Sequence, residues 1–507
     1  MTDKLLSGAD PAKSDLDALL QTLRLTTFAR NHAPFADEAL RGQHTYQRYL
    51  LDLATHELAQ RERNRHIQRI RAARFPVLKE RLECYQGLVE QRLTEMGAEV
   101  GSAGLVDKAQ AAQFARAGVH LIVCYVGTYA TSSQVLPVVQ RSQAPVLILN
   151  LQPVPALNYP DTDTAEWLAN CCACCVPEIA NAFARSRITF NVVSGLLQPA
   201  AGQANRYYER AWAEIGGRVR AANVMQELQR GRIGFLGHTY PGMLDMYSDF
   251  TMHHAQLGAL VEVLEMEDLA SRVAEVNGAE LGAQIACGLD RLASDFDLNG
   301  LTYYYRGLAG NANEELGAGL IMGNSLLTAR GVPASGEGDL KTCIATLIMD
   351  RLGAGGSFTE FYAMDFNDDF ILMGHDGPGH IAIADGKPVL RGLGLFHGKR
   401  GYGLSVEFRV KTGPITILGM TQTAEGQLKM LVAEGTSLPG ATLQIGNTNS
   451  RLKFGLDPAA FMNRWAEKGE THHCALGIGH HAGALGKLAC LMGLELAVIG
   501  ESNAGKI

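Results

Sequence analysis

The sequence lacks the features of several protein classes. It contains no apolar run long enough to span a bilayer. Its first ten residues lack a basic region followed by an apolar stretch, so we expect no secretory signal. The net charge is −7 and the pI is about 6.1, whereas a nucleic-acid-binding protein normally has a strongly basic face. We therefore expect a cytoplasmic protein that binds neither membrane nor nucleic acid.

Cysteine is too scarce for a disulfide framework, with ten residues in a chain of 507. Five positions from Cys171 to Cys175 read Cys-Cys-Ala-Cys-Cys and raise the alternative of a zinc or redox protein. Adjacent pairs with one residue between them do not match the usual zinc spacings. The segment lies in a helical stretch, Thr164 to Arg185, so a packed helix with small apolar side chains is the favoured interpretation.

The length and composition predict a multidomain globular chain. A chain of 507 residues is too long for one core and suggests roughly two to four domains. Fifty-six glycines suit an α/β protein with tight strand-to-helix turns. Alternating helices and apolar strands predict two doubly wound, parallel-sheet (Rossmann-like) domains, and β-rich segments joined by turns predict a C-terminal antiparallel β-barrel-like domain. The expected divisions are a helical extension at 1–73, α/β domains at 74–199 and 200–352, and the β-rich domain at 353–507.

The chemistry concentrates between Gly336 and His380. Glu337 and Glu360 lie beside glycines or at segment edges, and His375 follows Gly374 at the end of a strand-like run. Further along the chain, His480 and His481 offer more imidazole. Two carboxylates and two imidazoles suit Mn²⁺, Co²⁺, Fe²⁺ or Zn²⁺ better than Ca²⁺ or Mg²⁺. Four such ligands leave an octahedral ion two positions, which a substrate with two adjacent oxygens could fill. The alternative is that Glu337 caps a helix and the histidines are ordinary surface or core residues.

These segments resemble the metal-binding segments of L-arabinose isomerases, and they occur in the same order. The resemblance rests on the string Gly-Glu-Gly-Asp-Leu-Lys-Thr from Gly336 to Thr342, on the Glu360 segment, on Gly374-His375 and on His480-His481. It extends from about Arg232 to the C-terminus and is fainter from about Phe75 to Pro199. L-fucose isomerases share the general architecture.

The resemblance implies a metal-dependent isomerase that moves hydrogen between C1 and C2 of a sugar through an enediolate. The metal ligands would be Glu337, Glu360, His375 and His481. The two glutamates would also transfer the protons, and sequence does not decide which is acid and which is base. The expected ion is Mn²⁺, or another divalent metal such as Co²⁺. The family forms hexamers, which implies a homo-oligomer.

Further residues are candidates for binding and support. The substrate-binding candidates are His238, Met243, Tyr247 and His480, and those expected to orient the metal ligands are Asp339 and Lys341. The first three lie in a long loop after a buried strand, where functional residues are common. His238 could equally be a structural turn residue, Met243 and Tyr247 could be core, and Lys341 could simply pair with Asp339.

The N-terminal extension departs from the family. We find no strand before Phe75, and a charged helix from Tyr46 to Arg71 stands where the family has its first strand and a loop that helps line the sugar site. The helix is interpreted either as a solvated helix packed on one side or as an oligomer contact or partner-binding arm. The departure keeps three functions open: an L-arabinose-like substrate, another sugar such as L-fucose, D-arabinose or a tetrose, and a non-catalytic sugar-binding protein.

Overall fold

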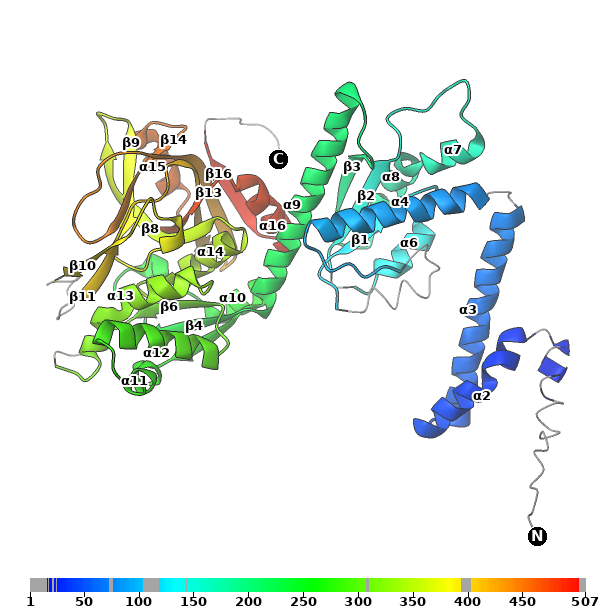
Figure 1. The fold of residues 1–507 in the computed structure, drawn as a ribbon, viewed down its shortest axis with the longest axis horizontal. Coiled ribbons are helices and arrows are strands. Elements are labelled where there is room, and N and C mark those ends of the chain that lie inside the picture. The colour runs from blue at the N-terminus through cyan, green and yellow to red at the C-terminus, as the bar shows by residue number, and fades with distance from the viewer. Residues whose placement is uncertain are drawn as a thin grey trace, which may run out of the picture. The chain divides into compact units, whose positions relative to one another are not determined.

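The computed structural model describes residues 16–500 except positions 17, 21, 24, 73–75, 104–117, 143, 307–309 and 394–402. The chain forms two compact units, Met1–Ala213 and Glu214–Ile507 (Figure 1). A long helix, α9, contains the boundary between them. None of the described helices combines the length and apolar character that crossing a membrane requires.

The first unit begins with helices and continues as a parallel α/β structure. Its helices are α2 (Thr26–Arg41), α3 (Tyr46–Ala72), α4 (Pro76–Glu95), α6 (Ser132–Val139), α7 (Thr164–Ala169), α8 (Cys172–Arg185), the short η1 (Gly202–Ala204) and the start of α9 (Asn205–Arg230). Its strands are β1 (Ile122–Tyr125), β2 (Val146–Gln152) and β3 (Phe190–Leu196), which pair in parallel in that order. As predicted, no strand precedes β1 in the part of this unit that the structure describes.

The second unit opens with a parallel sheet of four strands in the order β5-β4-β6-β7. The elements are β4 (Arg232–Gly237), η2 (Leu244–Met246), α10 (Phe250–Leu257), β5 (Leu260–Leu264), α11 (Met266–Ala274), α12 (Leu281–Asp295), β6 (Gly300–Tyr304), α13 (Glu314–Ala329), β7 (Ala334–Ser335) and α14 (Leu340–Arg351). Asp339 is the N-cap of α14 and accepts a hydrogen bond from the backbone N–H of Thr342 at 3.0 Å.

A closed antiparallel barrel follows, with the strand order β12-β15-β8-β9-β14-β13 and a β12–β13 pairing that completes the ring. Its elements, with the helices and strands between and around them, are β8 (Gly355–Asp365), β9 (Phe370–His375), η3 (Ile381–Ile383), β10 (Val389–Leu393), β11 (Gly403–Glu407), β12 (Gly413–Gln422), β13 (Leu428–Leu438), β14 (Thr448–Phe454), α15 (Pro458–Glu467), β15 (His473–Ile478), α16 (Ala482–Met492) and β16 (Glu495–Ile499). β16 adds in parallel to β13. The predicted fold class, parallel α/β domains followed by a barrel, is confirmed.

Helix α14 joins the sheet and the barrel of the second unit. All its residues from Leu340 to Met349 are buried. One core cluster combines α14 side chains with Ile233 and Phe235 of β4 and with Leu418 and Met420 of β12. Because the helix packs on both layers, the loop before it and the strand after it are held in fixed positions beside the barrel strands.

Candidate metal centre

Three neighbouring barrel strands bring a glutamate and two histidines together. Glu360 lies in β8, His375 ends β9, and His473 begins β15. In the antiparallel register, Glu360 is directly opposite His473 on one side and Gly374 on the other. Glu337 comes from the loop between β7 and α14, so two layers of the fold contribute to one cluster.

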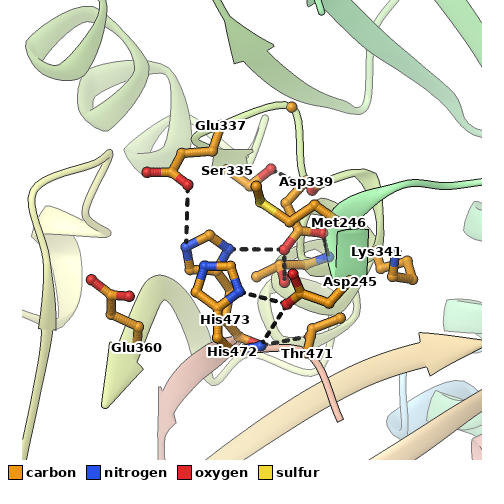
Figure 2. A network of polar contacts seen from close by, with 12 residues as sticks. Asp245, Met246, Ser335, Glu337, Asp339, Lys341, Glu360, Thr471, His472 and His473 are labelled. Carbon is orange, nitrogen blue, oxygen red and sulfur yellow. Dashed lines mark hydrogen bonds and ion pairs between the residues drawn. The ribbon is translucent and has the colours of Figure 1, made fainter. Parts of the chain in front are cut away.

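The four side chains converge within a few ångströms. The Nε2 atoms of His375 and His473 lie 3.1 Å apart. The Nε2 of His375 lies 4.0 Å from a Glu337 carboxylate oxygen and 3.9 Å from a Glu360 oxygen, and the Nε2 of His473 lies 3.8 Å from the other Glu337 oxygen. In Figure 2, Glu337 and Glu360 lie on one side of the imidazoles of His472 and His473, and Asp339 and Asp245 lie on the other.

The Nδ1 atoms of His375 and His473 are held by hydrogen bonds to other residues. His473 Nδ1 lies 3.0 Å from Asp339 Oδ2, so its N–H donates to the carboxylate and Nε2 is left with a lone pair. The backbone N–H of Gly377 donates to His375 Nδ1 at 2.7 Å, which places the ring proton of a neutral His375 on Nε2. That proton then points at His473 Nε2. When Nε2 of His375 binds a cation, the ring proton is on Nδ1 instead. Asp376 Oδ1, 3.3 Å from Nδ1, is placed to accept a hydrogen bond from it.

The cluster is largely shielded from water. The side chain of His473 is 0% exposed and that of His375 is 3% exposed, whereas Glu337 and Glu360 are 16% and 27% exposed. The ring of Phe358 packs against both imidazoles, with centroid distances of 4.3 Å. Burial raises the pKa of Glu360, and the charge of His472 offsets this only in part. Burial lowers the pKa of His473 despite the hydrogen bond to Asp339. The imidazole of His473 is therefore neutral and able to bind a cation.

Glu337 has an unfavourable backbone conformation. Its φ is +64°, in the left-handed region that non-glycine residues rarely adopt. The neighbouring Gly338, at φ +69°, leaves no room for a side chain, because a Cβ there would lie 2.5 Å from the carbonyl oxygen of His238. The conformation is held by a hydrogen bond from Tyr240 N–H to the Glu337 carbonyl at 2.9 Å. Strain of this kind is typical of residues kept for function.

Glu337→Gly is expected to give a more stable protein than Glu337→Ala, by about 1 kcal/mol in the free energy of unfolding. Both substitutions remove the carboxylate, but only glycine adopts a positive φ without steric cost. Urea unfolding of the two variants side by side measures the difference. An alanine variant as stable as the glycine variant would contradict the assigned backbone strain.

His472 forms a second polar pair next to the cluster. Its Nδ1 lies 2.5 Å from Asp245 Oδ2, and its backbone N–H donates to the same oxygen at 3.1 Å. Burial pulls the pKa of His472 down, but the hydrogen bond and charge of Asp245 outweigh it, so the pKa is raised. Burial would raise the pKa of Asp245, but the bonds from His472 lower it to about 2. His472 also forms, with Glu337 and His473, one of the groups whose ligand atoms lie within 4.8 Å of one another.

The predicted substrate-binding loop lies beside the cluster. Asp245, which holds His472, is part of this loop, and so are His238, Met243 and Tyr247. Met243 and Tyr247 are 38% and 48% exposed. The ring of His238 packs at 5.0 Å from that of Tyr304, and its Nδ1 lies 3.0 Å from the Thr239 carbonyl. The loop contacts the cluster through Asp245, which holds His472, and through the Tyr240 N–H, which donates to the Glu337 carbonyl.

Lys341 and Asp339, which the sequence predicts to orient the metal ligands, make different contacts: Asp339 holds His473, and Lys341 does not contact a residue of the cluster in the hydrogen bonds that the structure gives it. The Lys341 ammonium is buried and donates to the Tyr247 carbonyl at 3.1 Å and to Ser248 Oγ at 3.0 Å. It therefore fixes the end of the loop rather than a metal ligand. Burial would raise the pKa of Asp339, but the hydrogen bond from His473, the charge of Lys341 and the backbone N–H of Thr342 lower it, so this buried residue is a carboxylate.

The structure does not bring His480 or His481 into the cluster. Both follow the end of β15, whereas His473 begins it, and each strand residue advances about 3.3 Å. His481 Nε2 lies 2.9 Å from the Ile478 carbonyl, and His480 Nε2 lies 3.4 Å from the Gly435 carbonyl. Neither belongs to a candidate metal-binding group among the described residues. His473 therefore takes the position assigned to His481 from the sequence.

The sequence interpretation missed His472, His473 and Asp245. Two His-His pairs flank the same strand, and the pair after it was chosen. The signal for the other pair is the register of an antiparallel sheet: the start of β15 is opposite Glu360, and its end is not. Sequence gives this register only once the pairing of β8 with β15 is known.

The Cys171–Cys175 segment is structural in the part of the chain that the structure describes. Cys171 is the N-cap of α8, and Cys171, Cys172 and Cys175 are buried against the first sheet. None of the candidate metal-binding groups contains a cysteine. Burial raises the pKa of Cys171 to about 11, which leaves it a neutral thiol. The packed-helix interpretation holds.

The donor set fits a divalent transition-metal ion. Two imidazole nitrogens and the carboxylates of Glu337 and Glu360 form the mixed nitrogen and oxygen shell that Mn²⁺, Co²⁺, Fe²⁺ or Zn²⁺ accepts. The candidate groups of the structure are Glu360 with His375 and His473, Glu337 with His472 and His473, and Glu337 with His375 and Asp376. Backbone and carboxylate partners orient both rings, as is usual for metal-binding histidines.

Two comparisons with known proteins show what parts of the chain are similar to. Residues 355–495 match the L-arabinose isomerase C-terminal domain family. A sulfoquinovose isomerase from Alkalicoccus urumqiensis is 24% identical over 263 residues, which cover 46% of this chain and 58% of the relative's length. Glu360, His375 and His473 all fall within the matched domain, whereas Glu337 precedes it. Residues 355–495 are therefore similar to the C-terminal domain of L-arabinose isomerases.

Proposed function

We propose that this protein is a metal-dependent aldose–ketose isomerase that moves hydrogen between C1 and C2 of a sugar. The observation that carries the proposal is the convergence of Glu337, Glu360, His375 and His473, with two carboxylates partly exposed and two imidazoles buried. A divalent ion at these residues, for which we propose Mn²⁺, would polarise the sugar's carbonyl oxygen.

The two glutamates are the proton-transfer groups of the proposed reaction. One carboxylate removes the proton from C2 and returns it to C1, and the other handles the hydroxyl proton. Glu360 is the more exposed of the two glutamates, and burial raises its pKa above the ordinary value of a glutamate, which favours a role as a base. We therefore assign the C–H proton to Glu360. His472, held by Asp245, lies within reach of the oxygens of Glu337 and orients a hydroxyl group of the substrate.

The substrate that we propose first is an aldose similar to L-arabinose. The alternatives are L-fucose, D-arabinose, a tetrose and, because of the relative's name, sulfoquinovose. We also expect a homo-oligomer, with a hexamer as the state that the family resemblance suggests.

Incubating the protein with Mn²⁺ and each of these aldoses in D₂O tests the proposal. We expect a ketose from at least one sugar, with deuterium incorporated at the transferred position. Glu360→Gln should slow exchange by about 10²- to 10⁴-fold, the usual contribution of a general base. Glu425→Gln, in the turn between β12 and β13, serves as the matched control.

Two other outcomes would change the assignment. A ketose formed without deuterium would favour a direct hydride shift over proton transfer by the glutamates. Sugar binding without ketose and without exchange for every aldose would contradict the enzyme and favour a non-catalytic binding protein.

A further inference from the structure

The four cysteines at the start of α8 fall into two pairs with different surroundings. Cys172 and Cys175 are buried in the core cluster of the first unit, so packing against the sheet accounts for them. Cys174 is exposed and takes no part in that core. Cys171 is 7% exposed and is the N-cap residue of α8. Packing therefore leaves Cys174, and its relation to Cys171, to be explained.

The side chains of Cys171 and Cys174 are hydrogen-bonded to each other. Burial, and after it this hydrogen bond, raise the pKa of Cys171 to about 11, so the Cys171 thiol keeps its proton beside the Cys174 sulfur. Among the described residues, no candidate group of three metal-binding side chains includes either cysteine. Two thiols in contact without further ligands have the chemistry of a disulfide pair rather than that of a metal site.

The position of this pair at the start of the helix permits a disulfide. The Cys-X-X-Cys spacing places the two Cα atoms about 5 Å apart, from the rise and radius of an α-helix. Disulfides span roughly 4.4–6.8 Å between Cα atoms. The sulfur atoms must also approach, and the N-cap residue allows this because its backbone, at φ −90° and ψ 26°, lies outside the helical region.

Cys172 and Cys175 have the same spacing, but both lie within the regular helix. Side chains three residues apart in a helix have Cβ atoms about 5–6 Å apart, which is longer than the roughly 3.5–4.5 Å that a disulfide requires. The Cys175 sulfur is also engaged elsewhere. It accepts the backbone N–H of Ala130 at 3.2 Å and donates to the Cys171 carbonyl at 3.6 Å. A disulfide is therefore expected in the first pair and not in the second.

We propose that Cys171 and Cys174 are a reversible oxidation site, at which hydrogen peroxide converts the two thiols to a disulfide. Exposed thiols beside a second cysteine are the usual sites of this reaction. The pair lies in the first unit, whereas the residues of the proposed metal site all lie in the second. The site is therefore independent of the proposed isomerase chemistry.

The reaction proceeds in two steps, in which the sulfur atoms lose two electrons to the peroxide. The Cys174 sulfur attacks one peroxide oxygen, the O–O bond breaks, and the other oxygen leaves as water with the thiol proton. This step gives a sulfenic acid at Cys174. The Cys171 sulfur then attacks the Cys174 sulfur, the S–O bond breaks, and the Cys171 proton leaves with the hydroxide as a second water. Two thiols and one peroxide thus give one disulfide and two waters.

The test follows one peptide of the full chain. Trypsin releases residues 142–185, which contain the four cysteines of the cluster and no others. The protein is treated with hydrogen peroxide, unfolded in N-ethylmaleimide, digested and analysed by mass spectrometry. We expect four alkylated thiols before treatment, two after it, and four again when dithiothreitol precedes the alkylation. Fragmentation should place the two remaining alkyl groups on Cys172 and Cys175.

Replacing single cysteines by serine separates the two steps. Cys171→Ser removes the second step, so Cys174 should stop at a sulfenic acid that dimedone traps, and excess peroxide should convert it to a sulfinic acid. Cys174→Ser should keep its three thiols. Cys175→Ser is the matched control and should still lose two of its three thiols to a disulfide.

Two results would overturn the proposal. The first is a wild-type peptide that keeps four thiols at a peroxide dose that oxidises Cys287, an exposed cysteine on α12. This measurement does not depend on the folding of any variant. The second is the loss of two thiols in Cys174→Ser, because the disulfide would then join a different pair.

Discussion

Replacing His473 by alanine is expected to reduce the affinity for Mn²⁺ by more than about 100-fold, whereas replacing His481 by alanine is expected to leave it unchanged. Loss of a partner behind a metal ligand costs about 10- to 100-fold, and loss of the ligand itself costs more. The structure places the Nε2 of His473 3.1 Å from His375 and 3.8 Å from Glu337. His481 instead contacts the carbonyl of Ile478.

His473→Gln separates the ligand from its structural role. Alanine leaves the buried Asp339 carboxylate without its imidazole partner, which is costly in itself. A glutamine side-chain amide can still donate a hydrogen bond to Asp339 but does not provide an imidazole nitrogen to an ion. We expect weak Mn²⁺ binding in both His473 variants by titration calorimetry, with a native-like circular dichroism spectrum for the glutamine variant. Strong binding in either variant, or loss of binding in His481→Ala, would reverse the assignment of the two histidines.

The free energy of unfolding is expected to fall as the pH rises from about 5 to 8, and Glu470→Gln is expected to remove a large part of that slope. Burial raises the pKa of Glu470 to about 8 from an ordinary value of 4.5, and the backbone N–H of Thr471 and the charges of Lys429 and Lys341 offset this only in part. The space for the carboxyl is left by Gly419, where a Cβ would lie 2.6 Å from Glu470 Cγ.

The sign follows from proton binding. Between pH 4.5 and 8 the folded state keeps the Glu470 proton and the unfolded state releases it, so stability is complete below 4.5 and is lost as the pH approaches 8. The loss is about 1.4 kcal/mol per pH unit and reaches the order of 4 kcal/mol. Glutamine has no proton to lose. The raised pKa of His472 also reduces stability as the pH rises, so the difference between variant and wild type isolates Glu470.

Urea unfolding at four pH values from 5 to 8 measures this difference. Glu467→Gln, at an exposed position on the adjacent helix α15, is the control and should keep the wild-type slope. If Glu470→Gln loses stability with pH as steeply as the wild type, Glu470 is ionised throughout the range and the assigned effect of burial is wrong.

The sequence predicted the features that depend on local chemistry. Glu337 was singled out beside glycines at a segment edge, and the structure gives Glu337 and Gly338 φ values of +64° and +69°. The alternation of helix and strand predicted the parallel sheets, and the turn-rich C-terminal part predicted the barrel. Glu337, Glu360 and His375 were identified because each stands at a recognisable break between segments.

The features that sequence could not give depend on long-range pairing. His473 reaches the cluster because β15 pairs with β8. The two strands are far apart in the chain, since His473 at the start of β15 comes 108 residues after Asp365 at the end of β8. His480 and His481 form the same kind of histidine pair, but they follow the end of β15, whereas Glu360 is opposite its start. Asp245 was not recognised because its partner His472 comes 227 residues later. Contacts of this kind are decided by register, not by the residues near either partner.

Helix α14 makes the C-terminal family domain dependent on what precedes it. The matched segment begins at residue 355, after the helix has ended, yet Glu337, Asp339 and Lys341 all belong to the chain before it. Cutting there would remove Glu337, one of the four residues of the proposed metal site, and would expose to water the apolar surface that α14 covers. The barrel and the sheet must therefore be inherited and synthesised as a pair, and recombination between them is viable only if both halves come from compatible parents.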